Sequence, residues 1–249
     1  ITCLEEPFRS HWAGQDPFAA VEDLQGEVLR ALEGRRTLRT EVAGRGYYVK
    51  IHRGIGWGEI IKNLLSGRLP VLGAGNEWRV LERLTALGVD TMRAVAFAER
   101  GSNPARRHSF IITEELAPTV SLEDFCRDWR AVPPAPTFKR ALICRVAEMA
   151  RRMHGGGVNH RDFYICHFLL HLPVDVDAPR LSLIDLHRAQ VRETTPRRWR
   201  RSRPGPSGTD LCGRPASTGW TTTSPACDPR QGDEHDERRQ RVPRRGGDR

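Results

Sequence analysis

The chain has 249 residues, of which 38% are apolar, and it carries a formal net charge of +9 at pH 7. This length allows one large domain or two lobes, and no run approaches the ~20 apolar residues that a membrane-spanning helix requires. The positive charge favours acidic partners such as phosphorylated substrates, an anionic membrane surface or nucleic acid. An arginine-rich coding sequence would give the same balance without such a partner.

The six cysteines lie far apart and form no Cys-x-x-Cys pair. Structural zinc sites and disulfide frameworks usually show short, regular cysteine spacings, so we expect neither here. The first residues do not resemble a secretory signal. A reducing cytoplasm is therefore the expected compartment.

Three strand-like runs, at residues 28–32, 38–42 and 47–51, are separated by short links rich in turn-forming residues. This pattern predicts a three-strand antiparallel meander. In a kinase the first such link lies over the nucleotide phosphates, which would place Arg35, Arg36 and Thr37 there. The link contains a single glycine and does not match a Gly-rich loop, so a solvated basic turn is an equal alternative.

Lys50 lies in the third run, and strand alternation separates it from the apolar face of Tyr47, Val49 and Ile51. A lysine within a strand that is otherwise buried needs a partner. We expect this lysine to hold the α and β phosphates of a nucleotide and to pair with a helix carboxylate. The alternative is an edge-strand lysine that faces water.

The carboxylate for this pair is expected from the next strong helix signal, residues 76–87, which Asn76 is expected to cap. Glu77 lies in its first turn, where a carboxylate suits the helix dipole. Glu82 is the second candidate, and a solvated glutamate is the alternative for both.

The apolar run 109–113 predicts a buried strand, and Glu114, Glu115 and Leu116 follow at its end. In a bilobal kinase this is the hinge, where backbone groups bind the adenine edge. The alternative is an ordinary strand exit.

A helix is predicted over about residues 137–154 from apolar positions that recur one turn apart, and three glycines end it. His160, Arg161 and Asp162 follow as a His-Arg-Asp motif. A kinase catalytic loop has this motif, followed by a metal-binding residue five places later. Asp162 is therefore the candidate catalytic base, with His160 and Arg161 as its motif neighbours.

Two further apolar runs, 168–172 and 181–184, predict a hairpin, and Asp185 ends the second. Asp185 is the candidate Mg²⁺ ligand because hard cations prefer carboxylate oxygens. His167 occupies the position of the usual second metal ligand. Since imidazole is a poor Mg²⁺ ligand, we expect His167 to orient Asp162 or a phosphate. Arg188 begins a basic segment, interpreted as a contact for anionic sugars or a membrane surface, or as a solvated face.

The predicted fold is α+β, bilobal and protein-kinase-like, with an N-terminal lobe over residues 1–116 and a C-terminal lobe over 117–200. Residues 201–249 form a basic, low-complexity tail. Of these 49 residues, 32 are Arg, Gly, Pro, Ser or Thr and 7 are apolar, a composition that cannot bury a core. We therefore expect an incomplete C-terminal lobe and a tail that is disordered or the product of a reading-frame shift near Arg201.

The most specific stretches are residues 109–114, 158–162, 164–171 and 184–190. Through these stretches, the chain resembles the lipopolysaccharide core heptose(I) kinases of Gram-negative bacteria, and the resemblance covers roughly residues 4–200. The resemblance implies a protein-kinase-like fold, with ATP and Mg²⁺ as cofactors. It implies phosphorylation of heptose I of the inner core at its 4-hydroxyl, on the cytoplasmic side of the inner membrane. The implied partner is the heptosylated lipid A–Kdo precursor, with peripheral contact to the inner membrane.

One position beside the motif departs from this family. Phe163 stands where the family usually has cysteine, so its ring is either tolerated or crowds the site.

Three other interpretations remain open: a protein kinase of the same fold, an inactive truncated kinase, and a basic nucleic-acid-binding protein. The family-specific stretches favour a sugar acceptor over a protein. A nucleic-acid-binding surface would interleave Lys and Arg with exposed aromatic residues. Here the aromatic residues fall mainly in predicted strands and helices, so we expect no nucleic-acid partner.

Overall fold

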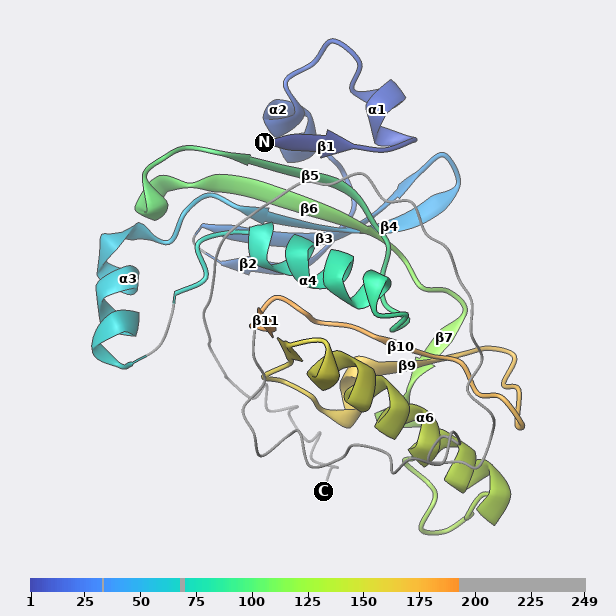
Figure 1. Cartoon of the computed structure of the whole chain (residues 1–249). Coiled ribbons are helices and arrows are strands. Elements are labelled where there is room, and N and C mark those ends of the chain that lie inside the picture. The colour runs from blue at the N-terminus through green and yellow to red at the C-terminus, as the bar shows by residue number, and fades with distance from the viewer. Residues whose placement is uncertain (33, 68–69, 193–249) are drawn as a thin grey trace, which may run out of the picture.

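The computed structural model describes residues 1–32, 34–67 and 70–192, which form both helices and strands. Figure 1 shows a large sheet with α4 beneath it and, further below, a second region built around α6 and short strands. This mixture agrees with the predicted α and β content. The division into lobes at residue 116 remains a prediction, and the tail, residues 201–249, lies outside the described residues.

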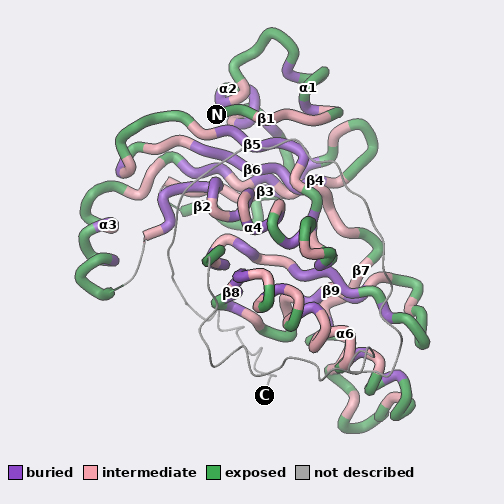
Figure 2. The backbone as a smooth tube through the Cα atoms, viewed as in Figure 1, coloured by how far each residue is buried: buried purple, intermediate pink, exposed green. Residues whose placement is uncertain are grey.

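The large sheet has six antiparallel strands and contains the predicted meander as β2–β3–β4. In their order across the sheet, the strands are β1 (Thr2–Leu4), β5 (Ala94–Arg100), β6 (His108–Glu114), β4 (Arg45–His52), β3 (Arg35–Val42) and β2 (Glu27–Leu32). The central strands are the most buried, as Figure 2 shows for β5 and β6.

The N-terminal segment covers one face of this sheet with α1 (Phe8–His11) and α2 (Pro17–Glu22). Asp16 caps α2 by accepting a hydrogen bond of 3.1 Å from the Phe18 N–H. The ring of Phe8 lies edge-on to Tyr47, with centroids 5.0 Å apart. Alternation in β4 therefore directs Tyr47 into this aromatic core and leaves Lys50 on the opposite face.

The opposite face of the sheet packs on α4 (Gly75–Ala86). Trp78 stacks on Phe97 with centroids 5.2 Å apart, and Leu84 is fully buried. The expectation that Asn76 caps this helix is wrong. The N-cap residue is Ala74, whose side chain cannot accept a hydrogen bond, and Asn76 is the second residue of the helix. The Asn76 side chain instead makes the contacts described below.

Below α4, one continuous core joins α4 to the second region, with Met149 and Met153 of α6 in the same cluster as Leu84. The predicted long helix and hairpin are present as α6 and β9–β10. The elements of this region are β7 (Thr119–Ser121), α5 (Leu122–Phe125), α6 (Pro136–Gly155), β8 (Val158–Asn159), η2 (Ile165–His167), β9 (Phe168–His171), β10 (Leu181–Leu183) and β11 (Gln190–Val191).

Two short elements lie beside the large sheet: α3 (Gly56–Leu65), which follows β4, and η1 (Pro104–Arg106), which precedes β6. Ile60 of α3 packs with Ala105 of η1 and with Leu72. The described part of the chain contains no helix that is long and apolar enough to span a membrane.

Cys126 and Cys166 are free thiols. Cys3 and Cys144 are each disulfide-bonded, although the scattered cysteine spacing does not favour a disulfide framework. Spacing along the chain does not determine which cysteines meet in space.

The packing of α4 gives a first prediction. Leu84→Ala removes a fully buried side chain and should lower the free energy of unfolding by about 2–5 kcal/mol, because the cavity adds to the lost transfer energy. Leu65→Ala is the matched control, since Leu65 is 85% exposed, and we expect a change within about 0.5 kcal/mol. Urea unfolding monitored by fluorescence measures both. Equal effects would contradict the assigned core.

Candidate functional site

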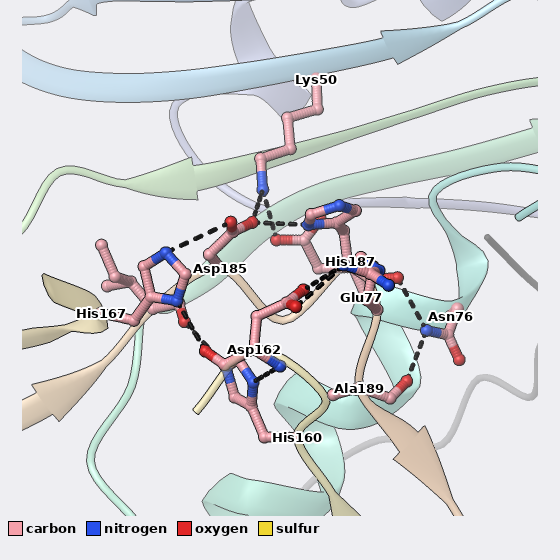
Figure 3. Close-up of polar contacts among 11 residues, drawn as sticks. Lys50, Asn76, Glu77, His160, Asp162, His167, Asp185, His187 and Ala189 are labelled. Carbon is pink, nitrogen blue, oxygen red and sulfur yellow. Dashed lines mark hydrogen bonds and ion pairs between the residues drawn. The ribbon is translucent and has the colours of Figure 1, made fainter. Parts of the chain in front are cut away.

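Charged side chains from the sheet, from α4 and from the loop after β10 meet between the two regions (Figure 3). The ammonium group of Lys50 on β4 lies 2.7 Å from Glu77 Oε1 on α4 and 3.9 Å from Asp185 Oδ1. Three elements distant in the sequence thus contribute one charge each to a common point.

The Lys50–Glu77 pair is the one expected from the sequence, and Glu82 is not the partner. The side chain of Glu77 is 2% exposed and that of Lys50 16% exposed. Removing one partner of such a pair leaves an uncompensated buried charge, which costs about 3–5 kcal/mol. Glu77 Oε2 is buried and has no hydrogen-bond partner among the described residues.

The three residues expected over the nucleotide phosphates separate in the structure. Thr37 pairs with Lys50 across β3 and β4, and paired residues share a face of the sheet. Arg35 lies on this face as well, two residues earlier. Arg36 points to the other face and donates to the backbone oxygens of Glu22 and Leu24. Its expected place over the phosphates is therefore wrong, because adjacent strand residues face opposite sides.

Arg35 is half-buried next to the charged cluster. Burial lowers the pKa of its guanidinium, while the charges of Glu77 and Asp185 oppose this change. Its Nε atom has no hydrogen-bond partner among the described residues. Burial, and then the charges of Arg35, Lys50 and His187, also lower the pKa of His52 well below its usual value. The positive charges of Arg35 and Lys50 therefore lie in one neighbourhood, which suits an anion such as a phosphate chain.

Asp185 has a positive φ of 57°, a left-handed conformation that is uncommon for residues other than glycine. His187 Nδ1 lies 2.6 Å from Asp185 Oδ1, and His167 Nε2 lies 3.7 Å from Oδ2. Burial raises the pKa of Asp185, but the hydrogen bond from His187 and the charges of His187, Lys50 and His167 outweigh it. The net effect holds the pKa of Asp185 well below its usual value. The carboxylate is therefore ionised at neutral pH.

The described residues contain no group of three or more His, Cys, Asp or Glu side chains that could hold a metal ion. Asp185 alone still fits Mg²⁺, which commonly binds one or two carboxylates and completes its shell with phosphate oxygens and water. The site thus suits a cation that binds together with a nucleotide.

Asp162 lies in the same site and is 8% exposed. Arg188 donates to both of its carboxylate oxygens, at 2.8 and 3.1 Å. Arg188 is itself 7% exposed, so its interpretation as an outward-facing contact for sugars or membrane is wrong. The sequence places it only three residues after Asp185, which was the available signal for a role in the site.

Two histidines fix the backbone around Asp162. The Asp162 N–H donates to His160 Nδ1 at 3.1 Å, and His160 Nε2 lies 3.1 Å from the oxygen of Ile184. His160 thus bridges the Asp162 loop and the residue that precedes Asp185. Burial is the main cause of its lowered pKa, which favours the neutral ring that accepts through Nδ1. His167 Nδ1 lies 2.7 Å from the backbone oxygen of Asp162.

Arg161 is exposed, in contrast to the buried Asp162 beside it. Phe163 is half-buried and packs edge-on against Phe168, with centroids 4.9 Å apart. Its ring therefore joins the core beneath the loop.

A further contact, not expected from the sequence, ties α4 to the loop after Asp185. The side-chain amide of Asn76 donates to the backbone oxygens of His187 and Ala189, at 3.0 and 2.7 Å (Figure 3). Asn76 is the neighbour of Glu77, so one helix turn holds both the lysine partner and the Asp185 loop.

The expected hinge is only partly available to a nucleotide. The N–H of Glu114 donates to the Arg93 oxygen, and that of Glu115 donates to the Gly46 oxygen. The Glu115 carboxylate is held by Arg39 at 2.8 and 2.6 Å, and this hydrogen bond lowers its pKa. These two amides and this carboxylate are therefore already engaged, which leaves Leu116 as the candidate donor for an adenine edge.

Comparisons with known proteins identify the family of this chain. The model of the lipopolysaccharide kinase (Kdo/WaaP) family matches residues 19–203. The lipopolysaccharide core heptose(I) kinase WaaP of Pseudomonas aeruginosa is 68% identical over 199 residues, which cover 79% of this chain and 74% of the relative. The enzyme of the same name from Escherichia coli K12 is 58% identical, with 79% and 75% covered.

A solved structure described as WaaP in complex with acyl carrier protein superimposes with a TM-score of 0.70 at 60% identity. The match covers 80% of this chain and 76% of that chain. The chain therefore belongs to the lipopolysaccharide kinase (Kdo/WaaP) family.

Proposed function

We propose that this chain is a lipopolysaccharide core heptose(I) kinase that transfers a phosphoryl group from ATP to the 4-hydroxyl of heptose I in the inner core. The observation that supports this most is the meeting of Lys50–Glu77, Asp162 and Asp185 in one site. We further propose a bilobal, protein-kinase-like arrangement, with lobes over residues 1–116 and 117–200. The acceptor is the heptosylated lipid A–Kdo precursor, and the reaction takes place at the cytoplasmic face of the inner membrane.

Lys50 binds the α and β phosphates, and Glu77 orients it. Arg35 and Thr37 extend this phosphate-binding surface, since both lie on the same face of the sheet as Lys50. Leu116 donates to the adenine edge. When bound, Mg²⁺ neutralises charge on the transferred phosphate, and Asp185 is the residue that would hold it. The ionised state of Asp185 at neutral pH supports this role.

Asp162 orients the acceptor hydroxyl and accepts its proton. Phosphoryl transfer depends mainly on positioning and charge stabilisation, so a strong base is not required. Arg188 holds Asp162 through a single nitrogen, which leaves acceptor lone pairs on both oxygens for the sugar hydroxyl. His160 and His167 keep the backbone of Asp162 in place. Arg161, which is exposed, is assigned no direct role.

The role of Asp162 predicts a loss of turnover. Asp162→Asn should lower kcat by about 10²–10⁴-fold while binding of Mg·ATP persists, because the phosphate-binding groups remain. Asparagine is chosen over alanine because it keeps polar contact with the buried Arg188. Asp177→Ala, at an exposed aspartate in a loop, should leave kcat unchanged. The measurement is transfer of labelled phosphate from ATP to the heptosylated precursor; wild-type turnover in Asp162→Asn would refute the assignment.

The Lys50–Glu77 pair predicts an effect on nucleotide affinity. Glu77→Gln removes the charge that orients Lys50 and should raise the KM for ATP roughly tenfold, in line with the loss of a charge-assisted contact. Glu82→Gln is the matched control on the same helix and should retain the wild-type KM. Steady-state kinetics with varied ATP decides this, and the pairing role fails if both variants behave alike.

The separation of Arg35 from Arg36 gives a prediction that the sequence alone does not. Arg35→Gln should raise the KM for ATP several-fold, because its guanidinium is directed to the phosphate site. Arg36→Gln should leave that KM unchanged, since its guanidinium bonds the backbone at the end of α2. Isothermal titration of each variant with Mg·ATP provides a second measurement. A larger effect for Arg36 would contradict the strand register described above.

A further inference from the structure

Helix α3 exposes an apolar stripe that nothing in the described part of the chain covers. Trp57, Ile61 and Leu64 are 54%, 53% and 55% exposed, and Leu65 is 85% exposed. At 100° per residue these four side chains lie within one sector of the helix. The buried side chains Ile60 and Asn63 lie on the adjacent sector, so the apolar face of α3 is wider than the surface on which it packs.

The chain connects α3 directly to the strand that carries Lys50 and, through a backbone hydrogen bond, to the β2–β3 link. The helix begins four residues after His52, at the end of the strand that carries Lys50. The Arg53 N–H donates to the Gly34 oxygen at 2.7 Å, which joins the start of this segment to the β2–β3 link. Leu32, at the end of β2, is another exposed apolar side chain, at 52%. Figure 1 shows α3 beyond the ends of β2 and β3, and Figure 2 colours most of its residues as exposed.

We propose that the exposed stripe of α3 (Trp57, Ile61, Leu64 and Leu65) inserts into the headgroup region of an anionic phospholipid bilayer. An amphipathic helix whose apolar face carries Trp and Leu side chains is the form that peripheral proteins use to lie in a membrane interface. Two cations flank the stripe, and each pairs with a nearby carboxylate: Lys62, 69% exposed, with Glu59, and Arg53, 43% exposed, with Glu22. Exposed pairs of this kind are weak, so both cations are available to lipid phosphates at an anionic surface.

The proposed acceptor is the reason for assigning a lipid bilayer as the binding partner of the α3 stripe, and this step rests on the proposed function. Heptose I belongs to the inner core of a lipid-linked sugar, so its hydroxyl lies close to the headgroups. A kinase that reaches it must present the opening of its site to the membrane surface. Docking through α3 would position that opening without a membrane-spanning segment.

Two other occupants fit the stripe less well. A ten-residue helix is about 15 Å long, so its exposed side falls well short of the about 800 Å² per partner that stable protein interfaces bury. This disfavours a second copy of the chain. A protein with an acidic surface, for which acyl carrier protein is the probe below, would select a broad basic surface, whereas the exposed side of α3 is mainly apolar.

The test is co-sedimentation of the full chain with vesicles of phosphatidylglycerol and phosphatidylethanolamine. The triple variant Trp57→Gln/Ile61→Gln/Leu65→Gln should bind these vesicles at least about tenfold more weakly than wild type, because most of the inserting apolar area is lost. The matched control is Val132→Gln/Val176→Gln, which changes two exposed apolar residues of the second region and should bind like wild type. Trp57→Phe should retain binding and lose the blue shift of tryptophan emission.

Three results would overturn the proposal. They are absence of vesicle binding by wild type, wild-type binding by the triple variant, and equal loss in the matched control. Light scattering and a binding assay with acyl carrier protein test the two other partners. If the triple variant binds vesicles like wild type but no longer self-associates, the stripe is a self-association surface. If it instead no longer binds acyl carrier protein, the stripe is the binding surface for that protein. Kinase assay on a deacylated, water-soluble acceptor separates the two claims: the triple variant should match wild type there, and inactivity of both would refute the proposed function alone.

Discussion

The structure depends on one nearly buried charge cluster, in which the Lys50 ammonium meets the carboxylates of Glu77 and Asp185. The sheet, α4 and the loop after β10 each supply one of these groups. Charges this far removed from water are tolerated only when they are paired, so the cluster constrains the relative position of the three elements. The amide of Asn76 adds a neutral contact between the same helix and the same loop. The surfaces that would bind nucleotide and metal are therefore held in register before either is present.

Much of this arrangement follows from local sequence rules. Alternation in β4 separates Lys50 from the apolar core, and the first turn of α4 is where a partner carboxylate is favoured. The meander, the long helix α6 and the β9–β10 hairpin also follow from periodicity and turn residues. The sequence-based prediction fails for the phosphate-binding link, where it assigns one role to three neighbouring residues. Side chains alternate between the two faces of a strand, so Arg36 points away from the face that Arg35 and Thr37 share.

The contacts that the sequence did not predict are polar and long-range. Arg188 bonds Asp162 across 26 residues, and Asn76 bonds the Asp185 loop across more than 110. No local pattern marks such partners, since they become neighbours only once the chain has folded. Arg188 shows the consequence: its place in a basic segment predicts a surface residue, whereas burial against Asp162 makes it part of the site. The hinge shows the opposite case, because the amides of Glu114 and Glu115 already donate to the oxygens of Arg93 and Gly46, which the kinase motif does not predict.

The two surfaces for which we propose functions differ in their exposure to solvent. The charge cluster is largely sheltered and is proposed to bind the nucleotide, while the α3 stripe is exposed and is proposed to position the chain relative to a lipid-linked acceptor. The two are connected through the end of β4 and the β2–β3 link. The most direct test of the central claim is an experimental structure of the chain with Mg²⁺ and a non-hydrolysable ATP analogue. The account predicts phosphates between Lys50 and Asp185 with Asp162 facing the acceptor side, and it would be contradicted by phosphates bound away from Lys50 or by Asp162 and Asp185 on opposite sides of the molecule.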